Sequence, residues 1–208
     1  MRTIATTLFA ALMLTACGTT KSNEKSDGSA AADEGNGEKL AENIRQTKSG
    51  NEKVTEYDLN RDGKPDVFVY TAPAKTEDGK DYDKLVRKDL DINWDGRVDI
   101  SRTYGDNEQV ETEKIDLDFD GKVDQVNYYE KGIIVRKERD VGYTGKPNTW
   151  IFYEKGKIVR KERDANGDGK VDYWEYWENG EVDRVGEDLD GDGNVDRWTK
   201  NPNNASEG

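Results

Sequence analysis

Six nine-residue segments of the chain combine carboxylates, amides and a glycine at fixed positions. They begin at Asp58, Asp91, Asp116, Asp140, Asp164 and Asp188. In five of them, positions 1, 3, 5 and 9 carry side-chain oxygens, position 6 is glycine and position 7 can offer its backbone carbonyl. Calcium takes about six to eight oxygen ligands, and glycine permits the sharp bend that such a loop needs. The pattern therefore predicts calcium-binding loops.

The five expected ligand sets share this spacing. Their side-chain ligands are Asp58, Asn60, Asp62 and Asp66; Asp91, Asn93, Asp95 and Asp99; Asp116, Asp118, Asp120 and Asp124; Asp164, Asn166, Asp168 and Asp172; and Asp188, Asp190, Asp192 and Asp196. The expected carbonyl ligands are those of Lys64, Arg97, Lys122, Lys170 and Asn194. One such segment could be an ordinary Asp-Gly turn, but five copies that keep aspartate at position 9 favour a metal.

The sixth segment, from Asp140, has Gly142, Thr144 and Asn148 at three of the ligand positions, so we expect it to be empty. The sequence thus predicts about five Ca²⁺ ions, one for each complete segment. Bound ions would also neutralise carboxylates that otherwise repel one another, so metal binding is expected to stabilise the folded state.

Over most of residues 58–196 these segments resemble the calcium loops of EF-hand-like proteins. An EF-hand adds a bidentate glutamate at position 12. That position holds Val69, Arg102, Asn127, Glu175 and Thr199 in the five complete segments, so only the loop from Asp164 could be finished in this way. The resemblance implies calcium binding, and the missing glutamates imply weak affinity, about 10⁻⁴–10⁻³ M as in extracellular modules.

The segments belong to a repeat of about 24 residues. Tyr129–Asp140 and Tyr153–Asp164 are identical at eleven of twelve positions and lie 24 residues apart. Valine-rich and aromatic segments follow each loop, then a short turn containing glycine, then a second strand-like segment. We therefore expect an all-β fold, an antiparallel meander of repeated β-hairpins over residues 50–200. An open sheet, a curled sandwich and a partial barrel all remain compatible with the pattern.

Aromatic side chains recur in register within the repeat. Counted from the first aspartate of each loop, position 11 is Phe68, Val126, Trp150, Trp174 and Trp198, and position 13 is Tyr70, Tyr128, Phe152 and Tyr176. Residues two apart share one face of a sheet, so these side chains should form a stripe. The stripe is expected to be the core of the sheet. The alternative is a carbohydrate-stacking or protein-binding surface.

Composition narrows the possible functions. The chain has 208 residues, a net charge of −13, one cysteine and no histidine. The missing histidine excludes Ser-His and Cys-His catalytic units, and the acidity argues against nucleic acid as a partner. Leu, Ile, Val and Phe make up only about 18% of the chain, so its hydrophobic core should be thin. Cohesion must then come from elsewhere, and bound ions are the expected source.

The N-terminus resembles that of bacterial lipoproteins. A basic start and a short apolar run precede Leu14-Thr15-Ala16-Cys17, which matches the lipobox of that family. The resemblance implies a signal peptide over residues 1–16, a lipidated Cys17 and, because Gly18 follows, an outer-membrane location with the face left open. Residues 17–49 are expected to be a flexible linker and 201–208 a disordered tail.

These observations together predict a membrane-anchored, calcium-stabilised β-repeat lipoprotein that acts as a structural or interaction module of the cell envelope, not as an enzyme. Its partner would be an unidentified envelope protein or polysaccharide. One alternative is a carbohydrate-binding protein in which Trp150, Trp174, Tyr176, Trp177 and Trp198 stack on sugar rings. A hydrolase that uses two carboxylates is a weaker alternative, because nothing selects a catalytic pair among 45 acidic residues.

Overall fold

A computed structural model of the chain describes residues 44–201. The expected signal peptide, the lipidated Cys17 and all of the expected tail except Asn201 lie outside these residues. The described part of the chain contains no helix that could span a bilayer.

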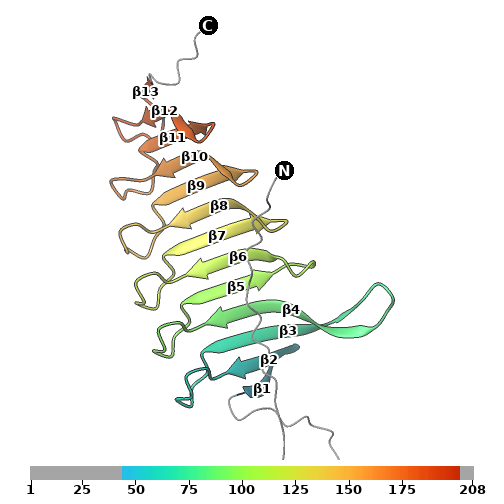
Figure 1. Cartoon of the computed structure of the whole chain (residues 1–208). Helices are drawn as coiled ribbons and strands as arrows, with labels where there is room; N and C mark the ends of the chain where they lie inside the picture. The colour runs from blue at the N-terminus through green and yellow to red at the C-terminus, as the bar shows by residue number, and fades with distance from the viewer. Residues whose placement is uncertain (1–43, 202–208) are drawn as a thin grey trace, which may run out of the picture. The chain divides into compact units, whose positions relative to one another are not determined.

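The described residues form thirteen strands. They are β1 (Ile44–Ser49), β2 (Glu52–Tyr57), β3 (Val67–Lys75), β4 (Asp81–Leu90), β5 (Ile100–Tyr104), β6 (Val110–Ile115), β7 (Gln125–Glu130), β8 (Ile133–Arg139), β9 (Thr149–Glu154), β10 (Lys157–Arg163), β11 (Tyr173–Glu178), β12 (Glu181–Glu187) and β13 (Arg197–Lys200). All thirteen belong to one sheet whose strand order follows the sequence, so each strand pairs only with its sequence neighbours (Figure 1).

The predicted all-β antiparallel meander is confirmed. Of the three arrangements left open by the sequence, the structure adopts the open sheet, because β1 and β13 each pair on one side only and no second sheet lies among residues 44–201. The acidic loops follow the even-numbered strands and gather at one edge, on the left in Figure 1. The short turns lie at the opposite edge.

The boundary expected between linker and repeat domain was wrong by one strand. Residues 44–49 were placed in the linker, but they form β1 and pair in register with β2, from Ile44 opposite Tyr57 to Ser49 opposite Glu52. The segment IRQTKS is polar and charged, as edge strands often are, and its composition therefore resembles that of a linker.

The turns of the last three hairpins are two-residue connections. Lys131-Gly132, Lys155-Gly156 and Asn179-Gly180 each place both residues at positive φ, the geometry of a type I′ turn. Glycine supplies the second of these conformations without strain. The hairpin of β3 and β4 is longer than the others, and it accounts for the larger spacing between the first two acidic loops.

Very little apolar surface is buried. Among the described residues, Val54 and Val67 are the buried apolar side chains, whereas ten polar or charged residues are buried, seven of them aspartates of the acidic loops. The thin core expected from composition is therefore observed. Strand pairing and the buried loop aspartates must carry much of the cohesion that a second layer supplies in a sandwich.

The aromatic stripe forms, but arginines cover it rather than a second layer. The position-13 aromatics Tyr128, Phe152 and Tyr176 alternate across successive strands with arginines of the return strands, Arg136, Arg160 and Arg184. The guanidinium carbon lies 4.2 Å from the ring centre in the first pair, 4.1 Å for Arg160 on Phe152 and 4.8 Å for Arg184 on Tyr176. Such cation–π contacts stabilise a sheet that is only one layer thick.

Candidate metal-binding loops

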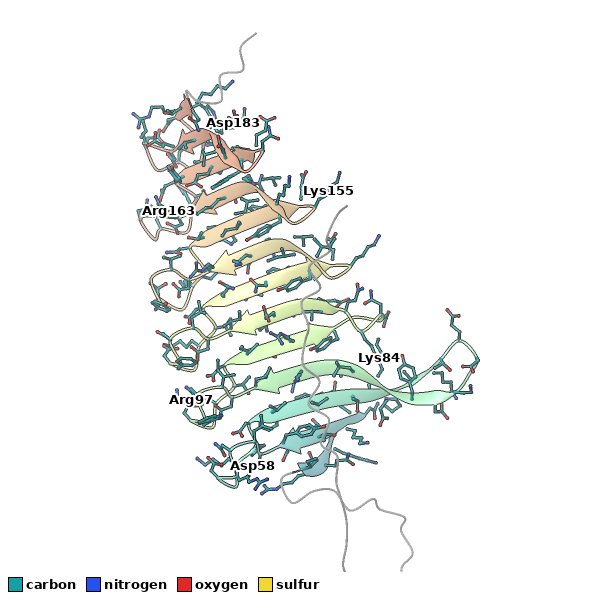
Figure 2. The ribbon with its side chains drawn as sticks, in the orientation of Figure 1. Asp58, Lys84, Arg97, Lys155, Arg163 and Asp183 are labelled. Carbon is teal, nitrogen blue, oxygen red and sulfur yellow. The ribbon has the colours of Figure 1, made fainter. Side chains whose placement is uncertain are left out.

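The six acidic loops continue the hydrogen-bond ladder of the sheet beyond the strands. The N–H of Asp116 donates to the carbonyl of Asp99 in the preceding loop at 2.8 Å, and the N–H of Asp140 donates to that of Asp124 at 2.8 Å. The other loops are joined in the same way. From the second loop on, position 1 of each loop is thus tied to position 9 of the loop before it, and the loops stack in register. Figure 2 shows Asp58, Arg97 and Arg163 along this edge.

Within each loop, aspartates organise the backbone. In the loop from Asp91, its Oδ1 accepts the N–H of Trp94 at 2.7 Å and its Oδ2 that of Gly96 at 2.7 Å. At position 9, Oδ2 of Asp99 accepts the N–H of Ile92 at 2.7 Å and that of Asn93 at 3.1 Å. Both aspartates are buried. These bonds satisfy backbone groups that would otherwise have no partner in the loop.

The ligand oxygens at positions 3 and 5 take part in the same scheme. Oδ1 of Asn93 accepts the N–H of Asp95 at 2.9 Å, and Oδ1 of Asp95 accepts that of Arg97 at 2.8 Å. Each of these side chains uses one oxygen to shape the loop. Asp99 uses only its Oδ2 in this way. Within residues 44–201 its Oδ1 accepts no hydrogen bond, so that oxygen is available to bind a cation.

Two of the five expected sets bring three carboxylates close together. Ligand oxygens of Asp116, Asp118 and Asp120 all lie within 4.8 Å of one another, and so do those of Asp188, Asp190 and Asp196. These two clusters could hold a metal ion. The other three sets have asparagine at position 3, and they bring no comparable group of three carboxylates together within the described chain.

The backbone carbonyls at position 7 are also compatible with metal binding by the loops. In the described residues, those of Lys64, Arg97, Lys122, Lys170 and Asn194 accept no hydrogen bond, whereas the carbonyl of Lys146, in the sixth loop, is approached by Thr144 Oγ1 at 3.4 Å. Five loops therefore combine an uncommitted carbonyl with side-chain oxygens. An oxygen-only donor set suits a hard cation such as Ca²⁺ and disfavours zinc or copper.

The loop from Asp140 is closed by its own groups. Its carboxylate accepts N–H bonds from Gly142 at 3.2 Å, Gly145 at 2.5 Å and Lys146 at 3.1 Å, and Thr144 Oγ1 lies 3.3 Å away. Burial alone would raise the pKa of Asp140, but the hydrogen bonds from Thr144, Gly145 and Gly142 hold that pKa below its ordinary value. That this loop binds no ion stays a prediction.

One conformational requirement of the loops was missed from the sequence. Glycine at position 6 adopts positive φ, as expected from the bend, but position 4 is also left-handed. Four of the loops place Arg61, Trp94, Phe119 and Tyr143 there. The signal was present, because the last two loops have Gly167 and Gly191 at this position.

The five residues expected to stack on sugars do not share one face. Trp150, Trp174, Tyr176 and Trp198 lie on the face of the aromatic stripe, with the ring centres of Tyr176 and Trp198 5.7 Å apart. Trp177 follows Tyr176 directly and therefore points to the other face, where its Nε1 donates to Glu175 at 3.1 Å. The set is thus divided between two surfaces.

No family model and no curated protein matches the chain. Among solved structures, the chain is similar to a complex of accessory secretory proteins 1, 2 and 3 of Streptococcus pneumoniae, with 13% identity over 61% of this chain and a TM-score of 0.27. It is also similar to S. aureus TarM in complex with Fondaparinux, alpha-GlcNAc-glycerol and UDP, with 14% identity over 68% of this chain and a TM-score of 0.29. The chain spans about a fifth of each matched chain. Similarity at these scores carries no argument about activity.

Proposed function

We propose that the protein is a membrane-anchored, calcium-stabilised β-repeat lipoprotein that serves as a structural or interaction module of the bacterial cell envelope. The observation that carries the proposal is the repetition of five loops, each pairing side-chain oxygens with an uncommitted carbonyl, on a sheet with almost no apolar core. An ion that binds the ordered loops better than the unfolded chain stabilises the fold by mass action.

The proposal of a lipid anchor is based on the lipobox that ends at Cys17. Acyl chains attached to Cys17 would hold the module at a membrane. We propose that the protein is not an enzyme, because the loop carboxylates already accept hydrogen bonds from backbone N–H groups of their own loops. The carbohydrate-binding alternative has less support, because Arg184 lies over the rings of both Tyr176 and Trp198, and Trp177 lies on the opposite face of the sheet.

The proposal is tested by thermal melts of the full-length chain in millimolar calcium and in chelator. We expect calcium to raise the melting temperature, and an unchanged melting temperature would contradict the proposal. A change at position 9 of one loop supplies a sharper comparison. Asn148 accepts the N–H of Val141 at 3.0 Å, so asparagine can organise a loop as aspartate does while removing a charged ligand.

Asp99→Asn should therefore melt close to the parent in chelator and gain less stability from calcium than the parent does. Asp99→Ala should be destabilised in both conditions, because the part-buried N–H groups of Ile92 and Asn93 would lose their acceptor, at a cost of about 1 kcal/mol. Equal calcium gains in the parent and in Asp99→Asn would show that this loop binds no stabilising ion.

A further inference from the structure

The face of the sheet opposite the aromatic stripe carries a cluster of basic side chains. They are equivalent residues of two successive repeats, and they alternate along β8 and β10 with the residues that belong to the stripe, so they share the other face. We name these four residues the basic patch: Lys137, Arg139, Lys161 and Arg163. Figure 2 shows Arg163 at the loop end of β10.

Three of these cations have no ionic partner in the described part of the chain. Within residues 44–201, the side chains of Lys137, Arg139 and Arg163 donate no hydrogen bond and form no ion pair. Arg139 Nε is buried without a partner. The guanidinium carbon of Arg163 lies 5.0 Å from the ring centre of Tyr173. Cations that have no counter-charge of their own favour an anionic ligand.

The surroundings of the basic patch do not neutralise it. On this face, strands β7 to β11 hold the four cations and one carboxylate, Glu175, a net charge of +3 on a chain whose total is −13. Glu175 lies 3.8 Å from Lys161. The flanking strands β6 and β12 add Glu113 and Glu187, and both are already paired with arginines. The basic patch is therefore a cationic surface on an acidic protein.

The basic patch repeats along the sheet with the period of the hairpins. Lys137 and Lys161 lie on either side of Ile151 in register, so equivalent cations are two strands apart, about 9.5 Å. Tyr129 and Tyr153 recur at the same interval in the neighbouring row of this face. A linear polymer whose charged unit recurs at this interval matches both repeats at once.

We propose that the basic patch binds an acidic polysaccharide that runs across the strands and carries about one carboxylate for every two sugar units. A disaccharide is close in length to the spacing of the cations, so successive carboxylates pair with successive repeats. The sugar rings then lie against Tyr129 and Tyr153. The inference names a partner for the interaction module proposed above and rests on that role, but not on bound calcium.

The spacing of the cations disfavours other polyanions. Duplex DNA carries one charge per about 1.7 Å of its axis, far more than four cations can balance, and the net charge of −13 would repel the excess. A bilayer presents headgroups without a fixed repeat, and a twisted sheet touches a plane over only a few strands. Neither ligand would use the regular interval between the repeats.

Equivalent positions of the two repeats supply the variants. Lys137→Gln with Lys161→Gln removes one patch cation from each repeat and keeps most of the aliphatic stem. Arg163→Gln, at the exposed patch residue, is a second variant. The control is Lys131→Gln with Lys155→Gln, which removes two cations from the turn edge of the same repeats. All chains are studied at full length with Cys17→Ser, so that no acyl chain contributes to binding.

Isothermal titration calorimetry with hyaluronate oligosaccharides, which carry one carboxylate per disaccharide, measures the binding in millimolar calcium. The parent and the turn-edge control should bind equally, and the double patch variant about tenfold more weakly. Arg163→Gln should also bind more weakly than the parent. Carboxyl-reduced hyaluronate, the neutral form of the same polymer, should give no heat.

Several results would overturn the proposal. They are no binding by the parent, equal affinity of the parent and both patch variants, and an equal loss in the turn-edge control. Binding of poly-glutamate, or of vesicles with one quarter phosphatidylglycerol, as tightly as hyaluronate would overturn it too, because the basic patch would then recognise charge without spacing.

Thermal melts of the same chains in calcium and in chelator separate this inference from calcium stabilisation. All of them should gain the same stability from calcium, because none of the changed residues is an expected ligand. A calcium-dependent rise in melting temperature without hyaluronate binding would overturn the partner and leave calcium stabilisation in place. Hyaluronate binding without such a rise would support the partner and contradict the calcium stabilisation.

Discussion

Glu113 on β6 shows how a single-layer sheet stabilises a charged side chain. It accepts hydrogen bonds from Arg102 Nε at 2.6 Å, Asn127 Nδ2 at 2.8 Å and Tyr129 Oη at 3.3 Å. Burial alone would raise the pKa of Glu113, but the hydrogen bonds and charge of Arg102, together with Asn127 and Tyr129, hold that pKa below its ordinary value. The carboxylate thus links strands β5, β6 and β7.

A depressed pKa in the folded state contributes stability that is complete above the unfolded value, about 4.5, and is lost as the pH falls through the folded value. Glu113→Gln should therefore lower the free energy of unfolding by about 1–2 kcal/mol at neutral pH. Urea titrations at several pH values should show the difference from the parent shrinking as the solution is acidified below pH 4.5.

Asp106→Asn is the matched control for Glu113. Asp106 pairs with Lys84 at 2.5 Å, and this ion pair lowers its pKa as well, but Asp106 is fully exposed. Exposed ion pairs contribute little to stability, so Asp106→Asn should unfold like the parent at every pH. A pH-independent difference between Glu113→Gln and the parent would mean that the side chain acts through packing and not through its charge.

Among the elements, the two-residue turns differ in how well their residues fit. Lys131 and Lys155 adopt φ of 51° and 50° at the first turn position, where the third equivalent turn has Asn179 at φ 53°. Asparagine tolerates the left-handed region better than lysine does. Lys155→Asn should therefore raise the free energy of unfolding by about 0.5–1 kcal/mol, measured by urea denaturation.

Figure 2 shows Lys155 at the turn edge, away from the acidic loops, so the gain should be the same with calcium and with chelator. The reciprocal change, Asn179→Lys, should lose a similar amount. If the two substitutions shifted stability in the same direction, φ at the first turn position would not be the cause.

The sequence predicted the elements that depend on local chemistry and missed those that depend on pairing. Glycine at loop position 6 and at the second turn position needs positive φ, so the loops and turns were readable from spacing alone. The β-bulges were not, because the unopposed residues, Val86, Glu111, Val135, Val159 and Asp183, are defined only by the register of the next strand.

The arginine cover of the aromatic stripe was hidden for the same reason. Arg160 lies over the ring of Phe152, and the two residues face one another across β9 and β10 only because the bulge at Val159 shifts the register. Their meeting follows from the turn and the bulged register together. The expectation of a core came from hydrophobicity, whereas the observed contacts depend on the pairing of ring and guanidinium.

For the molecule as a whole, the strand order means that the free energy of unfolding is approximately a sum of contributions from pairs of adjacent strands. Each strand pairs only with the strands before and after it in the sequence, and Val54 and Val67 are the buried apolar side chains among the described residues. Repeat proteins of this kind gain stability through each interface between adjacent units. The loop ladder adds a second set of links between successive hairpins, since Asp164 donates its N–H to Asn148 at 2.9 Å and Asp188 to Asp172 at 2.9 Å.

Within residues 44–201 the sheet has two edges without a partner strand, and both carry cations. β1 contains Arg45 and Lys48, and β13 contains Arg197 and Lys200. Pairing β1 of one molecule with β13 of another would extend the ladder, but it would bring like charges together across the new interface. The edge charges therefore oppose end-to-end association of the sheets.

Lys48→Thr with Lys200→Thr should weaken this opposition while keeping the β propensity of both edge strands. We expect the double variant to self-associate at lower concentration than the parent in sedimentation velocity runs. Raising the ionic strength should move the parent in the same direction, because salt screens exposed charges beyond about 10 Å at 0.1 M. Lys131→Thr and Lys155→Thr, which remove two cations from the turn edge, control for the change in net charge. Association of that control to the same extent would show that net charge governs solubility and that the edge positions have no special role.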